Sequence, residues 1–279
     1  MKTIAALITV HNRREKTLQC LRNLFSQNLP DGYTLDVFLT DDGCTDGTGD
    51  AVKKQFPEVN IIHGSGNLFW NRGMYLAWKN AAQKKDYDFY LWLNDDTFLI
   101  TDAISKLLHT SEDKINKAII VGTTCAFNDD KKLTYGGRIK NGEIVFAEKE
   151  PVLCNYFNGN IVLIPREVYQ KAGTNNPVFR HALGDFDYGL RASALGIESF
   201  VSPGISGQCD EHDKLAAWCN PNQPFKKRWK SFRSPAGQNP EEFFIFGKRH
   251  YGLYQACFHY FTNYLRVFCP GLWKNKSQL

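Results

Sequence analysis

The sequence predicts an α/β fold built on a doubly wound, mainly parallel sheet. Apolar runs of strand length alternate with stretches of helical periodicity through residues 4–121. A polar cluster follows each of the first four predicted strands, at the sheet edge where such folds bind ligands. With 279 residues, of which 43% are hydrophobic and 23% charged, the chain can bury a core, which excludes disorder and a fibrous repeat.

The first predicted strand covers residues 4–10, a nearly continuous apolar run as expected of a parallel strand that is buried on both faces. Leucines at 18, 21 and 24 and Phe25 then recur at helical spacing. The same alternation continues along the chain. Further strands are predicted at 35–39, 60–63, 89–93 and 118–121, and the helices between them at 51–56, 73–84 and 102–109.

The second half of the chain is less regular. Turn signals at Gly136-Gly137 and Asn141-Gly142 predict a loop and hairpin over 128–142. Strands are expected at 160–164 and 198–201, and helices at 166–172, 184–195 and 243–268. We therefore expect a catalytic domain over residues 1–204, with halves at about 1–100 and 101–204, and a C-terminal helical and aromatic extension over residues 205–279.

Asp95 and Asp96 follow the very apolar strand at 89–93. Keeping two adjacent carboxylates ionised at such a place costs free energy unless a cation lies beside them. Mg²⁺ and Mn²⁺ take carboxylate oxygens together with phosphate oxygens of a substrate, so the pair predicts a divalent metal site beside a diphosphate. The alternative is a turn at the strand end with an aspartate as helix cap.

A second acid cluster is formed by Asp185 and Asp187 at the start of the helix predicted at 184–195. A reaction in which a hydroxyl attacks needs a carboxylate that accepts the hydroxyl proton, and Asp185 is the candidate for this role. Asp187 is expected to pair with Arg191, four residues along the same helix, and to act in stability.

Four segments of the sequence carry a resemblance to a known family, through their residues and their order along the chain. They are Leu-Ile-Thr-Val-His-Asn at 7–12, Leu-Thr-Asp-Asp-Gly-Cys-Thr-Asp at 39–46, Leu-Asn-Asp-Asp at 93–96 and Gly-Asp-Phe-Asp-Tyr-Gly-Leu-Arg at 184–191. Together they resemble the family 2 glycosyltransferases of GT-A fold, over about residues 3–202. Residues 66–73, Gly-Asn-Leu-Phe-Trp-Asn-Arg-Gly, are similar to a segment of the rhamnosyltransferase-like branch.

The resemblance implies an inverting transfer of a sugar from a nucleotide-diphosphate sugar to a hydroxyl of a glycan or lipid-linked acceptor, in surface polysaccharide or other glycan biosynthesis. It implies Asp185 as general base and Asp96 as ligand of Mg²⁺ or Mn²⁺. Asn158 and Gly159 would approach the donor sugar and the acceptor. The residues implied at the nucleotide sugar are Thr9, His11, Asp41, Asp42, Asn67, Asn71 and Asp95.

The sequence also departs from the family pattern. The family often has an aromatic residue where His11 stands, and an acid where Gly184 stands. A histidine after the last core strand often completes the metal site, and here the candidate is His212, with a surface-loop role as the alternative. A zinc site formed by His212, Cys209 and Cys219 is set aside because structural zinc needs four ligands at tighter spacing.

The C-terminal extension combines cations with aromatic residues. A basic cluster at 226–233 holds much of the net charge of +5, and the segment at 243–268 is rich in Phe and Tyr. Such a combination suits an anionic membrane surface, so we expect peripheral membrane contact through this segment. The alternative is that residues 243–268 pack under the catalytic domain as a core helix.

The chain start does not resemble a signal peptide, and no stretch approaches the ~20 apolar residues of a membrane span. The eight cysteines form no C-x-x-C pair, and we expect reduced core thiols. These features predict a cytoplasmic protein, with the inner face of the membrane as the place of any peripheral contact.

Three other functions are alternatives to the transfer of a sugar. A nucleotide-binding oxidoreductase is excluded because no glycine fingerprint follows the first strand. A nucleic-acid-binding protein is disfavoured because the acids at 41, 42, 95 and 96 would repel phosphate unless a metal intervenes. A catalytically degenerate relative that only binds nucleotide sugar stays open.

Overall fold

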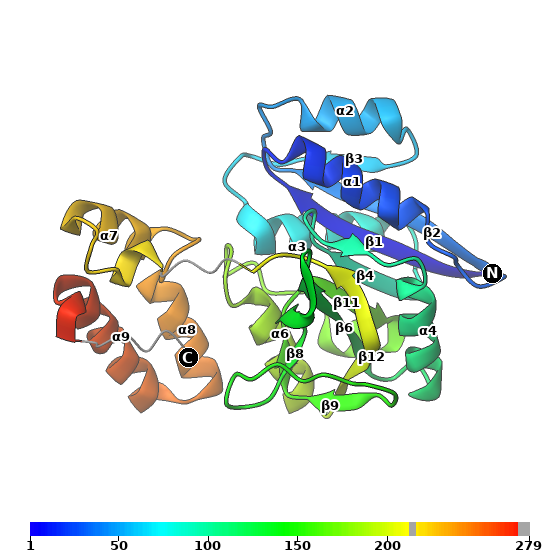
Figure 1. Ribbon diagram of the computed structural model, residues 1–279. Coiled ribbons are helices and arrows are strands. Elements are labelled where there is room, and N and C mark those ends of the chain that lie inside the picture. The colour runs from blue at the N-terminus through cyan, green and yellow to red at the C-terminus, as the bar shows by residue number, and fades with distance from the viewer. Residues whose placement is uncertain (212–215, 273–279) are drawn as a thin grey trace.

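A computed structural model describes residues 1–211 and 216–272 of the chain. Its centre is a single mixed sheet flanked by helices on both faces (Figure 1). The strand order along the main path of this sheet is β3 (Asn60–His63), β2 (Tyr33–Asp41), β1 (Lys2–Val10), β4 (Phe89–Leu93), β11 (Ile161–Pro165), β6 (Ile119–Ala126), β12 (Ser199–Gln208) and β5 (Phe98–Leu99).

The first four strands of this order are parallel, as the alternation of strand and helix predicted. Residues of β1 alternate between the two faces of the sheet, because successive side chains of a strand point in opposite directions. Ile4 and Ile8 pack with α1 (Arg14–Phe25) and α4 (Ala103–Asp113). Ala5 and Leu7 pack with α3 (Phe69–Lys84) and α6 (Gly184–Ala194) on the other face.

The other half of the sheet mixes directions. Strand β11 runs antiparallel to both β4 and β6, while β6 and β12 are parallel. Helix α2 (Thr48–Gln55) lies at the other end of the sheet, near β3 and α1. The mixed half is accompanied by α5 (Arg166–Ala172) and the short strands β7 (Asp129–Tyr135), β8 (Gly137–Arg138), β9 (Val152–Cys154) and β10 (Tyr156–Phe157). The α/β, mainly parallel architecture is confirmed, and strand β12 continues to Gln208, past the boundary expected at residue 204.

The C-terminal part is helical. It comprises the short 3₁₀ turns η1 (Ala217–Cys219) and η2 (Pro270–Leu272) and the helices α7 (Phe225–Arg233), α8 (Pro240–His250) and α9 (Leu253–Phe268). The single helix expected at 243–268 is wrong: the chain breaks after α8, where Gly252 adopts a φ of 91°. A side chain would be strained at that angle, so glycine permits the sharp turn between α8 and α9. The basic cluster at 226–233 forms α7.

Helix α8 joins the C-terminal helices to the catalytic domain, and it lies against α6 in Figure 1. Phe246 packs with Phe179 and Leu183 in one apolar cluster. The fully buried Asp187 accepts hydrogen bonds from Arg249 and His250 of α8, at 2.5 and 2.9 Å. The predicted pair with Arg191 is confirmed at 2.9 Å. Burial alone would raise the pKa of Asp187, but these three partners outweigh it and hold that pKa below its usual value.

None of the described helices combines the length and the apolar character that a membrane span requires. All eight cysteines are free thiols, five of them buried, which agrees with the expectation of reduced thiols.

The buried carboxylate predicts a large difference between two charge-neutralising variants. Asp187→Asn should lower the free energy of unfolding by about 3 kcal/mol near neutral pH, because it leaves Arg191 and Arg249 without their shared counter-ion. Glu241→Gln removes an exposed pair with Arg233 and should cost less than about 1 kcal/mol. Urea unfolding of both variants compares them.

The pH dependence provides a second measurement of the same network. A lowered pKa means that the stability from Asp187 is present above its unfolded-state value of ~3.9 and is lost as the pH falls below it. The gap between Asp187→Asn and the unaltered protein should therefore shrink in acid. Equal, small changes for both variants at pH 7 would contradict this account.

Candidate active site

A cavity of about 680 Å³ opens at the carboxyl edge of the parallel strands. Most of its lining comes from the ends of β1, β2, β4 and β12, the starts of α3 and α6, the loop after β10, and α8. Among the lining residues are Thr9, His11, Arg13, Asp42, Trp70, Asp95, Asp96, Asn158, Gly159, Asp185, Phe186 and Phe243. The polar clusters that follow strands one, two and four in the sequence thus meet in one crevice, as their positions predicted.

Asp95 and Asp96 lie side by side in this cavity, and both contact Arg13. One nitrogen of the Arg13 guanidinium is 2.6 Å from an Asp96 carboxylate oxygen and 3.2 Å from an Asp95 oxygen. The aspartate side chains are 7% and 11% exposed, whereas Arg13 is 42% exposed. A single cation therefore neutralises two buried acids, and it reaches them from the solvent side.

The surroundings of the two acids differ. Burial raises the pKa of Asp95 to about 7, although Arg13 opposes the shift. The other oxygen of Asp96 lies 3.8 Å from the thiol of Cys209, just beyond the end of β12. Burial and the nearby charge of Asp96 raise the pKa of that thiol to about 12, so Cys209 stays protonated near neutral pH.

Asp185 is held by two backbone groups. Its carboxylate accepts hydrogen bonds from the Gly159 N–H and the Phe186 N–H, each at 2.9 Å. Burial raises its pKa to about 6, and these hydrogen bonds limit the rise. The result is a carboxylate that is ionised near neutrality and is much more basic than an exposed aspartate. A proton acceptor in a cavity needs this combination.

Gly159 is the residue that the packing requires beside Asp185. A Cβ atom at this position would lie 2.5 Å from the indole of Trp70 and 3.4 Å from the Asp185 side chain. The Trp70 indole nitrogen in turn donates a hydrogen bond to Asn94, at 2.7 Å. Asn158 accepts one from Arg138 at 2.9 Å. The cavity wall around Asp185 is therefore fixed by close contacts rather than by a flexible loop.

Asp42 lines the cavity, but its carboxylate is occupied by the protein itself. One oxygen accepts a hydrogen bond from Gly66, at 2.7 Å, and the other accepts from Leu68 and Phe69, at 2.9 and 3.0 Å. Phe69 has a φ of 59°, which is strained for a residue with a side chain. The carboxylate thus caps the start of α3 from a neighbouring strand, and His11 contacts the Asp42 backbone oxygen at 2.7 Å.

Three residues predicted at the nucleotide sugar lie outside the cavity lining. Asp41 accepts a hydrogen bond from the Cys44 N–H at 2.8 Å and so holds the loop that follows β2. Asn67 is exposed. Asn71 is fully buried and donates to the backbone oxygens of Asn176 and Phe179, so it holds the 175–180 segment in place. His212 lies outside the described residues.

Thr9 does line the cavity, and its hydroxyl is buried without a hydrogen-bond partner among the described residues. An unpaired buried hydroxyl at a cavity wall suits a ligand that supplies the missing partner.

Sequence reasoning missed several residues of this site. Arg13 follows His11 and Asn12 at the end of the first strand, and that position was the signal that could have identified it. Trp70 lies inside a segment already singled out for its resemblance. Phe243 is brought in from α8, and nothing in the sequence links it to strand ends more than 140 residues earlier.

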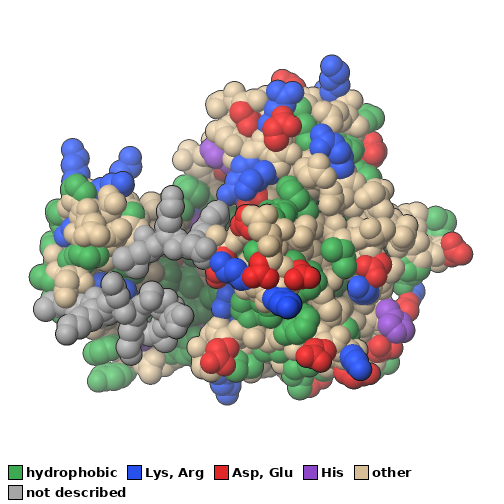
Figure 2. All heavy atoms as spheres, in the orientation of Figure 1, with side chains coloured by type: hydrophobic (Ala, Val, Ile, Leu, Met, Phe, Trp, Pro, Cys, Tyr) green, Lys and Arg blue, Asp and Glu red, His purple; other side chains and the backbone are tan. Residues whose placement is uncertain are grey.

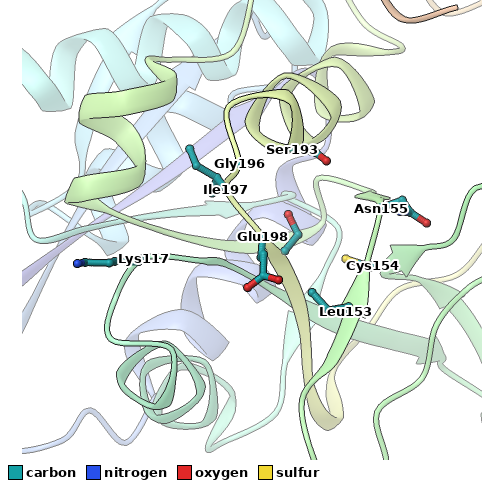
Figure 3. Close-up of a pocket in the computed structure, with 9 residues that line it drawn as sticks. Lys117, Leu153, Cys154, Asn155, Ser193, Gly196, Ile197 and Glu198 are labelled. Atoms are coloured by element: carbon teal, nitrogen blue, oxygen red, sulfur yellow. The ribbon is translucent and has the colours of Figure 1, made fainter.

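A second cavity, of about 640 Å³, lies at the opposite edge of the sheet, near the first residues of β6 and β12 (Figure 3). Lys117, Ser193 and Glu198 border it, and its described lining contains no pair of acids. The chemistry therefore belongs to the cavity at the carboxyl edge.

The sheet and its order of elements have the GT-A fold of solved glycosyltransferases. Residues 5–173, more than half of the chain, match glycosyl transferase family 2, and the protein belongs to that family. A comparison with the curated proteins finds no match.

Two solved structures share the fold at low sequence identity. The mannosyltransferase PcManGT from Pyrobaculum calidifontis, in complex with GDP-Man and Mn²⁺, gives a TM-score of 0.58 at 14% identity, over 96% of this chain and 73% of its own. S. aureus TarS 1-349 in complex with UDP gives 0.56 at 14% identity, over 75% of this chain. The match spans 60% of the TarS chain.

The role of Asp42 in holding the loop leads to a prediction. Asp42→Asn keeps the size but offers an amide group where two N–H donors now point, so the loop at 66–69 should loosen. Amide hydrogen exchange of Leu68 and Phe69 should accelerate at least tenfold. Asp50→Asn, at an exposed position of α2, is the matched control and should leave these amides unchanged. Unaltered exchange in Asp42→Asn would show that the carboxylate does not hold the loop.

Proposed function

We propose that this protein is an inverting, metal-dependent glycosyltransferase, which transfers a sugar from a nucleotide-diphosphate sugar to a hydroxyl of a glycan or lipid-linked acceptor. The observation that carries the proposal is the shared cavity: the Asp95–Asp96 pair and the basic carboxylate of Asp185 both line it. One acid pair suits the diphosphate side of the donor, and the other acid suits the attacking hydroxyl.

The donor side is assigned to Thr9, His11, Asp42 and Asp95, which lie around the ends of β1, β2 and β4. Solved proteins of the same fold carry UDP, UDP-GlcNAc or GDP-Man with Mn²⁺, which supports a nucleotide-sugar donor here. The likeness of residues 66–73 to the rhamnosyltransferase-like branch supports a deoxyhexose or hexose as the sugar. Asp41 and Asn71 act indirectly, through the loops that they hold.

The residues present fit a divalent cation. Arg13 already places a positive charge beside both carboxylates, which supports a cation site at this pair. Asp96 would be the protein ligand, with Asp95 beside it, and a Mg²⁺ or Mn²⁺ ion bound there would neutralise charge on the diphosphate leaving group. Arg13 contacts one oxygen of Asp96 at 2.6 Å and would compete with an ion for this carboxylate.

Asp185 is assigned as the general base. The acceptor oxygen attacks the anomeric carbon as the bond from that carbon to the diphosphate oxygen breaks, and the hydroxyl proton passes to the Asp185 carboxylate. Attack opposite the leaving group inverts the anomeric centre. The Gly159 and Phe186 N–H groups fix the direction of the carboxylate throughout.

The assignment of Asp185 predicts a specific kinetic pattern. Asp185→Asn keeps the shape and removes the basicity, so kcat should fall by about 10²–10⁴-fold while donor affinity changes little. In the unaltered enzyme, kcat/KM should rise with pH through about 6, because only the ionised carboxylate of the free enzyme accepts a proton. Steady-state kinetics, with the product anomer identified by NMR, measures both. Near-normal turnover in the variant, or retention of configuration, would overturn the assignment.

The assignment of Asp96 leads to a binding prediction. Asp96→Ala should abolish the gain in nucleoside-diphosphate affinity that Mn²⁺ provides, and the exposed control Asp50→Ala should not. Arg13→Met should strengthen Mn²⁺ binding to the free protein by about tenfold or more, because the competing guanidinium is gone. Isothermal titration and Mn²⁺ paramagnetic resonance measure the two effects. An undiminished Mn²⁺ effect in Asp96→Ala would remove the metal from the proposal.

A further inference from the structure

Helix α9 has an apolar face that is open to solvent. It is formed by Tyr254, Phe258, Phe261, Leu265 and Phe268, whose exposed fractions are 84%, 56%, 71%, 48% and 53%. Their spacing alternates between four and three residues, which places all five side chains on one stripe of the helix. We call this stripe the α9 apolar face.

The opposite side of α9 already anchors the helix. Ala256 and Val267 are buried, and Tyr264 packs against Phe232 and Trp229 of α7. The helix also packs closely on α8, which lies between α9 and the catalytic domain (Figure 1). Of the α9 apolar face, Phe268 alone has a ring contact with α7 among the described residues, so the exposure of Tyr254, Phe258, Phe261 and Leu265 requires another explanation.

The α9 apolar face continues into a cationic surface. The ring of Phe268 stacks on Phe225 of α7 with centroids 5.3 Å apart, and Phe225 is 45% exposed. The next turns of α7 carry the exposed Lys226, Lys227 and Lys230. Figure 2 shows cationic side chains projecting from the α7 side of the C-terminal helices, with apolar side chains at the surface nearby.

The positive charge of the protein is concentrated in the C-terminal part of the chain. Residues 216–279 contain ten Lys and Arg against two Asp and Glu, whereas residues 1–215 contain 24 against 27. The overall charge of +5 thus conceals a catalytic part that is slightly negative and a C-terminal part with a charge of +8.

We infer that the α9 apolar face and the lysines of α7 bind the surface of an anionic membrane. The aromatic side chains would enter the boundary between headgroups and acyl chains, and the lysines would contact the headgroup phosphates. Helix α9 has 16 residues, too few to cross a bilayer, so it lies along the surface. Self-association through this face is disfavoured, because it would bring together two C-terminal segments that each have a net charge of +8.

Helix α8 connects this surface to the catalytic cavity, because Phe243 of α8 lines the cavity and α8 packs directly on α9. The binding of the membrane itself does not depend on the reaction proposed above, since it concerns residues outside the cavity.

Vesicle co-sedimentation of the full chain tests the proposal. The unaltered protein should bind vesicles of 70% phosphatidylcholine and 30% phosphatidylglycerol. It should bind vesicles of pure phosphatidylcholine much more weakly. The double variant Phe258→Ser, Phe261→Ser should bind the anionic vesicles about tenfold or more weakly. The triple variant Lys226→Glu, Lys227→Glu, Lys230→Glu should lose the preference for anionic lipid.

A matched control replaces two equally exposed apolar residues elsewhere. Ile115 and Leu153 are 68% and 52% exposed, and Ile115→Ser with Leu153→Ser should bind vesicles like the unaltered protein. Mn²⁺-dependent binding of a nucleoside diphosphate checks that every variant keeps its cavity, and this readout separates a failure here from a failure of the proposed function. Absence of binding to anionic vesicles, or an equal loss in control and α9 variants, would overturn the inference. The inference would also be overturned if light scattering showed that the unaltered protein is a dimer and that the double variant Phe258→Ser, Phe261→Ser is a monomer.

Discussion

Two adjacent acids at a buried sheet edge can keep their charge only if a cation stays close to them, and much of this molecule is arranged around that requirement. Strand β4 delivers Asp95 and Asp96 to the carboxyl edge behind an apolar run, where water can solvate little of either side chain. The segment after β1 supplies this cation, Arg13. Because β1 and β4 are neighbouring parallel strands, the cation and the acids meet without any long loop. The same electrostatic demand makes the site suitable for a metal ion and a diphosphate.

Helix α6 shows how two aspartates two residues apart acquire opposite properties. Asp185 faces the cavity, accepts hydrogen bonds from two backbone N–H groups and has a raised pKa. Asp187 faces α8, is surrounded by Arg191, Arg249 and His250, and has a lowered pKa. The first is suited to accept a proton and the second to remain an anion. The helical turn separates the two roles, since it points the two side chains toward different neighbours.

The C-terminal helices combine both expectations for this segment of the sequence. Helix α8 packs on the catalytic domain and contributes Phe243 to the cavity, as a core helix would. Helix α9 exposes an aromatic stripe beside the lysines of α7. The break at Gly252 makes this division possible, because two helices joined by a sharp turn can present their aromatic residues to different surroundings.

The sequence by itself predicted the first four strands, their parallel direction and the edge at which the acids collect, because these follow from local hydrophobic periodicity and from the rule that parallel strands end together. It also indicated Asp185 and the Asp95–Asp96 pair from their places at a helix start and a strand end, and Asp187 from its spacing to Arg191. Only the tertiary structure decided that Arg13 neutralises the pair, that Asn71 and the Asp42 carboxylate hold loops, and that Phe243 reaches the cavity. These facts depend on contacts between residues far apart in the chain, and side-chain partners across such distances leave no periodic signal in a single sequence.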